Sequence, residues 1–210
     1  MNKLSNILFT LPSEKITDAE LSILLQGTKD RRYGLVKRAL KNQDLIHIRR
    51  GLYSLGLKYQ RQGLNLFDLA HRIYGPSFVS LESALSYHGW IPEGVYTVTS
   101  VTIKRPTEFH TPLEVFSYQK IPSKTSLFGV DRIQEGSNVF YMARPWRALV
   151  DYVYMYKKNW KEIDPLIFGM RIEKENLTSM PWLQVSELGR LYQSRRVSRF
   201  LKGIQKDLFS

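Results

Sequence analysis

The chain has 210 residues and a formal net charge of +12, from 31 Lys and Arg against 19 Asp and Glu, and 43% of its residues are hydrophobic. This composition excludes wholesale disorder, and a chain of this length can bury a core without disulfides or a structural metal. The sequence has no cysteine, which excludes disulfides, thiolate zinc sites and cysteine nucleophiles.

The N-terminal stretch does not have the pattern of a targeting segment. No segment approaches the roughly 20 uninterrupted apolar residues of a membrane span. The first apolar run meets Pro12 and Glu14 where a signal peptide would have small residues before a cleavage site. We therefore expect a cytoplasmic protein.

Positive charge is concentrated at the two ends of the chain. Residues 1–75 hold 13 Lys and Arg against 6 Asp and Glu, residues 76–165 hold 10 against 9, and residues 166–210 hold 8 against 4. A basic end on a nearly neutral middle is typical of a polyanion-binding module joined to a second unit.

Two short helices are predicted near the N-terminus. Thr17 and Glu20 have the spacing of a capping box, so a helix is expected over about residues 17–25. Gly27 ends this helix, and Thr28 can cap the next one, over residues 29–41. The second helix has an inner stripe of Leu35, Val36, Ala39 and Leu40, and Gly34 weakens it by up to about 1 kcal/mol relative to Ala.

A hairpin is expected after the second helix, with strands in residues 45–55 around a tight turn at Arg50 and Gly51. Helix, three-residue turn, basic helix and hairpin is the order of a winged helix-turn-helix, in which the second helix enters the DNA major groove. Residues 1–58 are therefore predicted to be a winged helix-turn-helix DNA-binding domain.

The predicted DNA contacts follow from the chemistry of the basic side chains. Arg31 and Arg32, with Tyr33, occupy the helix start, where a guanidinium can bond guanine O6 and N7. Lys37 and Lys41 are better placed for phosphates. The alternative is a solvated basic face that only packs against the rest of the chain. The full set of candidate DNA-binding residues is Thr28, Lys29, Arg31, Arg32, Tyr33, Lys37, Arg38, Lys41, Arg49 and Arg50.

The remainder, residues 67–210, is predicted to be an α+β domain, with residues 56–66 as the linker. Helices are expected at residues 67–75, at residues 80–89 and from Pro145 onwards. Strands are expected at residues 95–103, 113–118, 131–134 and 139–143, forming a mixed α/β domain with a mostly antiparallel sheet. One or two basic amphipathic helices are expected within residues 185–209.

We expect no enzyme, metal or cofactor. The four histidines lack metal-ligand spacing, and the chain has neither a phosphate-binding Gly-rich loop nor a GxSxG nucleophile elbow. A Ser83/His88/Glu93 triad lacks the supporting context, and His88 is better explained as a cation at a helix C-terminus. Tyr and Trp residues within 146–160 are interpreted as packing residues.

Several segments together resemble the AbiEi family of antitoxins and related transcriptional regulators in type IV toxin–antitoxin, or abortive infection, systems. The resemblance rests on Ser80 to Glu93 followed by Thr97 to Thr99, on Ala143 to Asp151, and on Arg49-Arg50-Gly51-Leu52-Tyr53. It covers most of residues 5–160.

This resemblance implies an N-terminal winged helix and a C-terminal antitoxin domain. Such a protein binds inverted repeats at its own promoter as a repressor and counters a nucleotidyltransferase-like toxin without forming a stable complex with it. The alternatives are a stand-alone transcriptional regulator, a module that binds a protein or RNA, and an enzyme acting on nucleic acid, which would need clustered carboxylates.

Overall fold

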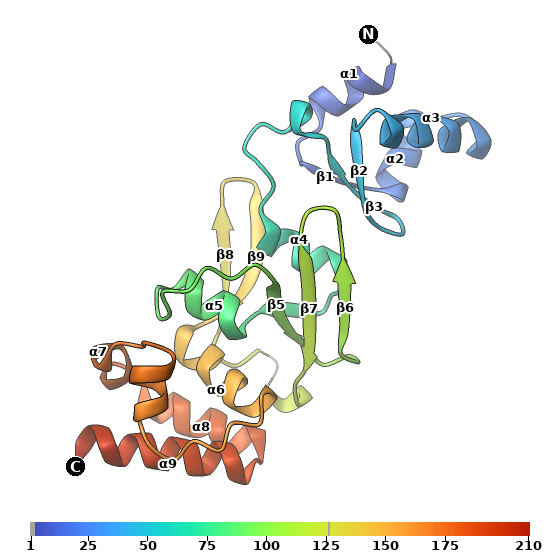
Figure 1. The fold of residues 1–210 in the computed structure, drawn as a ribbon. Coiled ribbons are helices and arrows are strands. Elements are labelled where there is room, and N and C mark those ends of the chain that lie inside the picture. The colour runs from blue at the N-terminus through green and yellow to red at the C-terminus, as the bar shows by residue number, and fades with distance from the viewer. Residues whose placement is uncertain (1–2, 126) are drawn as a thin grey trace.

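The N-terminal module, residues 3–59, combines helices with a small antiparallel sheet (Figure 1). The computed structural model describes residues 3–125 and 127–210. The sheet order is β1-β3-β2, so β3 is central. The elements of the module are α1 (Lys3–Thr10), β1 (Lys15–Thr17), α2 (Asp18–Leu25), α3 (Lys29–Lys41), β2 (Leu45–Arg49), β3 (Leu52–Leu55) and a 3₁₀ turn, Leu57–Tyr59.

The structure confirms the helix and turn signals of this module. The Thr17 hydroxyl accepts from the Glu20 amide at 3.2 Å, and the Glu20 carboxylate accepts from the Thr17 amide at 2.7 Å, which completes the capping box. The Arg50-Gly51 turn joins β2 and β3 as predicted. Sequence reasoning missed α1 and β1. Leu4 and Leu8 of α1 are buried in the same core as Ile16 of β1, so both elements are integral to the module.

The C-terminal module, residues 66–210, is built on a mixed six-stranded sheet of order β6-β7-β5-β4-β9-β8. The pairs β6·β7, β4·β5 and β8·β9 are antiparallel, whereas β5·β7 and β4·β9 are parallel, because long connections return the chain in the same direction. The strands are β4 (Ser77–Val79), β5 (Val98–Thr102), β6 (Thr107–His110), β7 (Val115–Lys120), β8 (Val130–Glu135) and β9 (Asn138–Ala143). The expected strands exist, and β4 and β6 were not predicted.

The helices of this module pack around the sheet and beyond its lower end in the view (Figure 1). Both expected C-terminal helices are present, as α8 and α9, and they form one core with α6. The helices are α4 (Leu66–Ile73), α5 (Leu81–Tyr87), α6 (Pro145–Met155), α7 (Lys174–Thr178), α8 (Trp182–Tyr192) and α9 (Arg195–Phe209), with 3₁₀ turn Ser123–Thr125 and π-helical turn Pro165–Gly169. Among the described residues, no helix is long and apolar enough to span a membrane.

The two modules share a hydrophobic cluster. Ile48 and Leu52 of the β2–β3 hairpin are buried against Leu69 and Ile73 of α4 and against Tyr118 of β7. The hairpin therefore contacts the C-terminal module as well as its own core.

The predicted linker is attached to the N-terminal module over much of its length. Tyr59 is buried in the core of that module. The Arg61 and Gln62 amides donate to the Glu14 carboxylate at 2.8 and 2.9 Å. Residues 56–62 are therefore structurally part of the N-terminal module, because their hydrogen bonds and the Tyr59 side chain attach them to it.

Candidate nucleic-acid interface

Helix α3 presents a basic face to solvent. Thr28 caps the helix, with its hydroxyl accepting from the Arg31 amide at 3.4 Å. Ala39 is buried and Leu40 half-buried on the inner side. On the outer side Asp30 is the acidic residue of the first turn. The exposed predicted residues of this helix are Lys29, Arg31, Tyr33, Lys37, Arg38 and Lys41.

Arg32 lies differently from the prediction, which assigned it to the outer side. It is half-buried, and its guanidinium donates to the Gly27 carbonyl in the turn between α2 and α3. Helical spacing explains the difference, because Arg32 shares a face with Leu35, Val36 and Ala39. Arg32 holds the α2–α3 turn, and Arg31 is the exposed guanidinium at the helix start.

The turn itself depends on Gly27. Its φ of +86° is a conformation that residues with a side chain rarely adopt, and a Cβ there would approach the Arg31 side chain at 3.4 Å. The glycine is therefore required by the backbone conformation of the turn.

The β2–β3 turn carries the other predicted arginines, Arg49 and Arg50, and both are exposed. The Asp18 amide at the start of α2 donates to the Gly51 carbonyl at 3.1 Å, which fixes the turn against the helix. Burial raises the pKa of Tyr53 to about 12, and a hydrogen bond to Asp18 adds to this shift, so the phenol stays protonated. In Figure 1, α3 and this turn both lie at the right of the N-terminal module.

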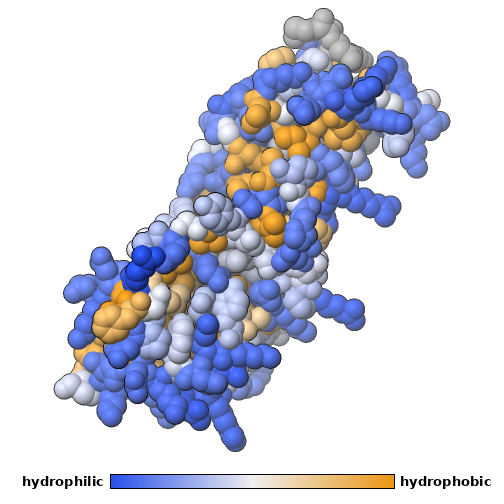
Figure 2. Space-filling view, viewed as in Figure 1, coloured by the Kyte–Doolittle hydropathy of each residue, from blue (hydrophilic) through white to orange (hydrophobic). Residues whose placement is uncertain are grey.

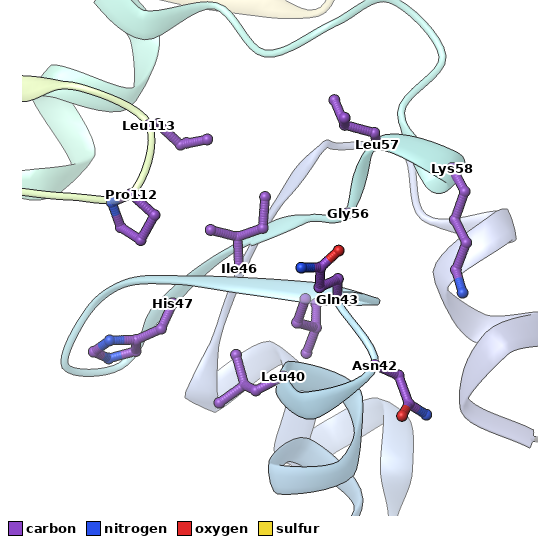
Figure 3. A pocket seen from close by; sticks show the side chains of 11 residues that line it. Leu40, Asn42, Gln43, Ile46, His47, Gly56, Leu57, Lys58, Pro112 and Leu113 are labelled. Atoms are coloured by element: carbon purple, nitrogen blue, oxygen red, sulfur yellow. The ribbon is translucent and has the colours of Figure 1, made fainter.

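A hollow of about 670 Å³ lies where the modules meet (Figure 3). Leu40, Ile46, Leu57 and Leu113 contribute apolar side chains to its walls, and Figure 2 shows hydrophobic surface in this part of the molecule. Its titratable lining side chains are His47 and Lys58, and Lys58 is paired with Asp44. The hollow is thus mainly apolar, without a nucleophile and base in contact.

The structure does not bring the considered triad together. Ser83 donates to the Thr97 carbonyl at 3.1 Å, His88 contacts the Ala143 carbonyl at 3.0 Å, and Glu93 pairs with Arg171. Within the described part of the chain no group of three or more His, Asp or Glu side chains has the geometry of a metal site.

The prediction that His88 acts as a cation at a helix C-terminus needs correction. It occupies the C-cap position of α5, as expected. Its side chain is half-buried against the Ala143 carbonyl, and burial lowers the pKa of its imidazole. The neutral form is therefore favoured over the cation that the sequence suggested.

The Tyr and Trp residues of 146–160 pack against one another and against the core. Tyr152 stacks on Trp160 with centroids 5.9 Å apart, and Trp146 meets Phe128 edge-on at 6.0 Å. This confirms their interpretation as packing residues.

Comparison with known proteins does not assign the chain to a family. No protein-family model and no curated protein matches it.

Proposed function

We propose that this protein is a sequence-specific DNA-binding transcriptional repressor whose N-terminal module is a winged helix-turn-helix. The observation that carries the proposal is the order α1-β1-α2-α3-β2-β3 with sheet order β1-β3-β2, together with the exposure of the basic side of α3 and of Arg49 and Arg50 at the β2–β3 turn. In a helix-turn-helix the N-terminal part of the second helix meets base edges.

The side chains divide into two roles. Arg31 reads a base, because it is exposed at the start of α3. Lys37 and Lys41 contact phosphates further along the helix, and Arg49 and Arg50 contact the backbone or an adjacent groove. Arg32 positions the turn through Gly27.

A binding titration tests this assignment. The full chain is titrated against duplexes from the region upstream of its own coding sequence and against a shuffled duplex of equal length. Arg31→Ala is expected to weaken specific binding by about 5- to 150-fold, the equivalent of about 1–3 kcal/mol, with a smaller effect on the shuffled duplex. Arg132→Ala, an exposed arginine of β8, is the matched control. Equal losses on both duplexes would contradict base reading by Arg31.

We further propose that the protein is a type IV antitoxin. The support is the resemblance of residues 80–99 and 143–151 to the AbiEi family. Co-expression with a nucleotidyltransferase-like protein encoded beside it is expected to restore growth, including with Arg31→Ala when both genes are driven by an unrelated promoter. Absence of any such neighbouring toxin, or growth arrest despite co-expression, would favour a stand-alone regulator.

A further inference from the structure

Helices α8 and α9 carry a second basic surface, at the end of the molecule opposite α3 (Figure 1). The exposed residues Arg195, Arg199, Lys202 and Lys206 follow one another along α9 at spacings of four, three and four residues. This spacing places them on one side of the helix. We call these four residues the α9 stripe. At the lower end of the molecule Figure 2 shows a largely hydrophilic surface.

Three residues of the stripe, Arg195, Arg199 and Lys202, line a groove of about 740 Å³ between α8 and α9. Arg190 of α8 forms part of the opposite wall, and Ser186, Ser194 and Ser198 add hydroxyl groups to the lining. Arginine, lysine and serine side chains are the groups that proteins use to contact phosphate oxygens.

Close packing of the two helices brings Arg190 beside the stripe. Gly189 is buried, and a Cβ at this position would lie 2.6 Å from the Leu201 side chain. The glycine lets α8 approach α9, and the next residue, Arg190, is exposed at the groove.

The basic side chains of this surface form no ion pair with carboxylates of the described residues. Over residues 3–125 and 127–210, no ion pair engages Arg190 or any residue of the α9 stripe. The first turn of α9 has no acidic residue, and Arg195 and Arg196 lie there beside the positive end of the helix dipole. The surface is therefore complementary to an anion.

The apolar side of α9 is packed inside the protein. Val197, Phe200, Leu201 and Ile204 are buried in the core of the C-terminal module. Membrane-surface helices need that side free to enter the lipid, so the arrangement argues against a lipid surface as the partner.

We propose that the α8–α9 groove binds the phosphate backbone of a nucleic acid, independently of base sequence and separately from α3. The α9 stripe spans twelve residues, and the eleven steps between its ends cover about 16 Å at about 1.5 Å per residue. One strand of a duplex has a phosphate about every 3.4 Å along the axis, so the stripe matches roughly five phosphates. Binding here adds affinity without adding base preference.

The test compares two triple variants of the full chain. Arg195→Ala/Arg199→Ala/Lys202→Ala removes three charges from the stripe. Lys120→Ala/Arg132→Ala/Lys174→Ala removes three exposed charges outside the groove and is the control. Affinity is measured over a range of salt concentrations for a duplex unrelated to the upstream region and for single-stranded RNA of equal length. Melting temperatures of both variants verify that they are folded.

The stripe variant is expected to lose about 2.7 from the slope of log affinity against log salt on duplex DNA, or about 2 on single-stranded RNA. The nucleic acid with the changed slope identifies the partner. The control variant is expected to keep the slope. Equal slopes for wild type and stripe variant on both nucleic acids would overturn the proposal. If the binding titration of the repressor proposal shows no preference for upstream DNA, that result counts against the proposed repressor. The comparison of salt slopes does not depend on that preference and still tests the α8–α9 groove.

Discussion

Arg147 shows how a single buried charge organises the C-terminal module. Its side chain is fully buried, its Nε donates to Asp151 at 2.7 Å, and its Nη1 donates to the Thr125 carbonyl. Asp151 also accepts from the Ser80 hydroxyl at 2.7 Å and from the Tyr192 phenol. Arg147 and Asp151 both lie on α6, and their other partners lie on different segments, so this network joins α6 to the start of α5, to residues 123–125 and to α8. Removing one partner of such a pair leaves an uncompensated charge, which usually costs about 3–5 kcal/mol.

His88 makes stability depend on pH. Burial lowers the pKa of its imidazole, with nearby Asp131 opposing the shift. As pH falls below the unfolded value of about 6.5, the unfolded chain binds a proton that the folded chain resists, so stability decreases with acidification. His88→Gln can still donate to Ala143 and is expected to reduce this loss.

Urea unfolding at pH 7.5 and pH 5.5 measures the effect. His47→Gln, at an exposed histidine, is the control and is expected to keep the wild-type loss of stability. An equal loss of stability in wild type and His88→Gln would show that the buried imidazole is not responsible.

At the scale of elements, prediction succeeded where the signal is local. The capping box at Thr17 and Glu20 and the cap at Thr28 act over three residues, and both were confirmed by hydrogen bonds. The Arg50-Gly51 turn is likewise short-range. Prediction failed for β4, which has three residues, and for α1, whose burial depends on strands far along the chain.

The sequence predicted which basic residues lie on α3, but it did not predict the orientation of every one of their side chains. Arg31 is exposed as expected, whereas Arg32 turns inward to Gly27. Counting charges identified both residues, and only the helix phase relative to the core separated their roles.

At the scale of the molecule, the two modules are joined by a buried ion pair. Lys15 of β1 pairs with Asp68 of α4 and donates to the Asn138 side chain of β9 at 3.1 Å. Burial lowers the pKa of Lys15 to about 8, with Arg72 adding to the effect. Desolvation therefore opposes the charged form even beside its carboxylate partner.

Removing one charge of this pair is expected to destabilise the chain more than removing both. Lys15→Met leaves Asp68 partly uncompensated, since Arg72 still contacts it at 3.4 Å, and should lower the free energy of unfolding by up to about 3 kcal/mol. Lys15→Met/Asp68→Leu should recover most of that loss, because two apolar side chains need no desolvated charge. Denaturant unfolding of the single and double variants measures the difference. A double variant that is less stable than Lys15→Met would show that the charges themselves stabilise the junction.

The sequence by itself determined the basic ends of the chain, the helix caps, the hairpin turn and the α+β class, since these depend on composition and on residues a few positions apart. Only the tertiary structure decided that β1 completes the N-terminal sheet, that Arg32 serves the turn, that Lys15 meets Asp68, and that Arg190 lies beside the α9 stripe. The physical reason is that burial, pairing and charge proximity arise from contacts between segments that are distant in the chain, and local patterns do not record which segments will meet.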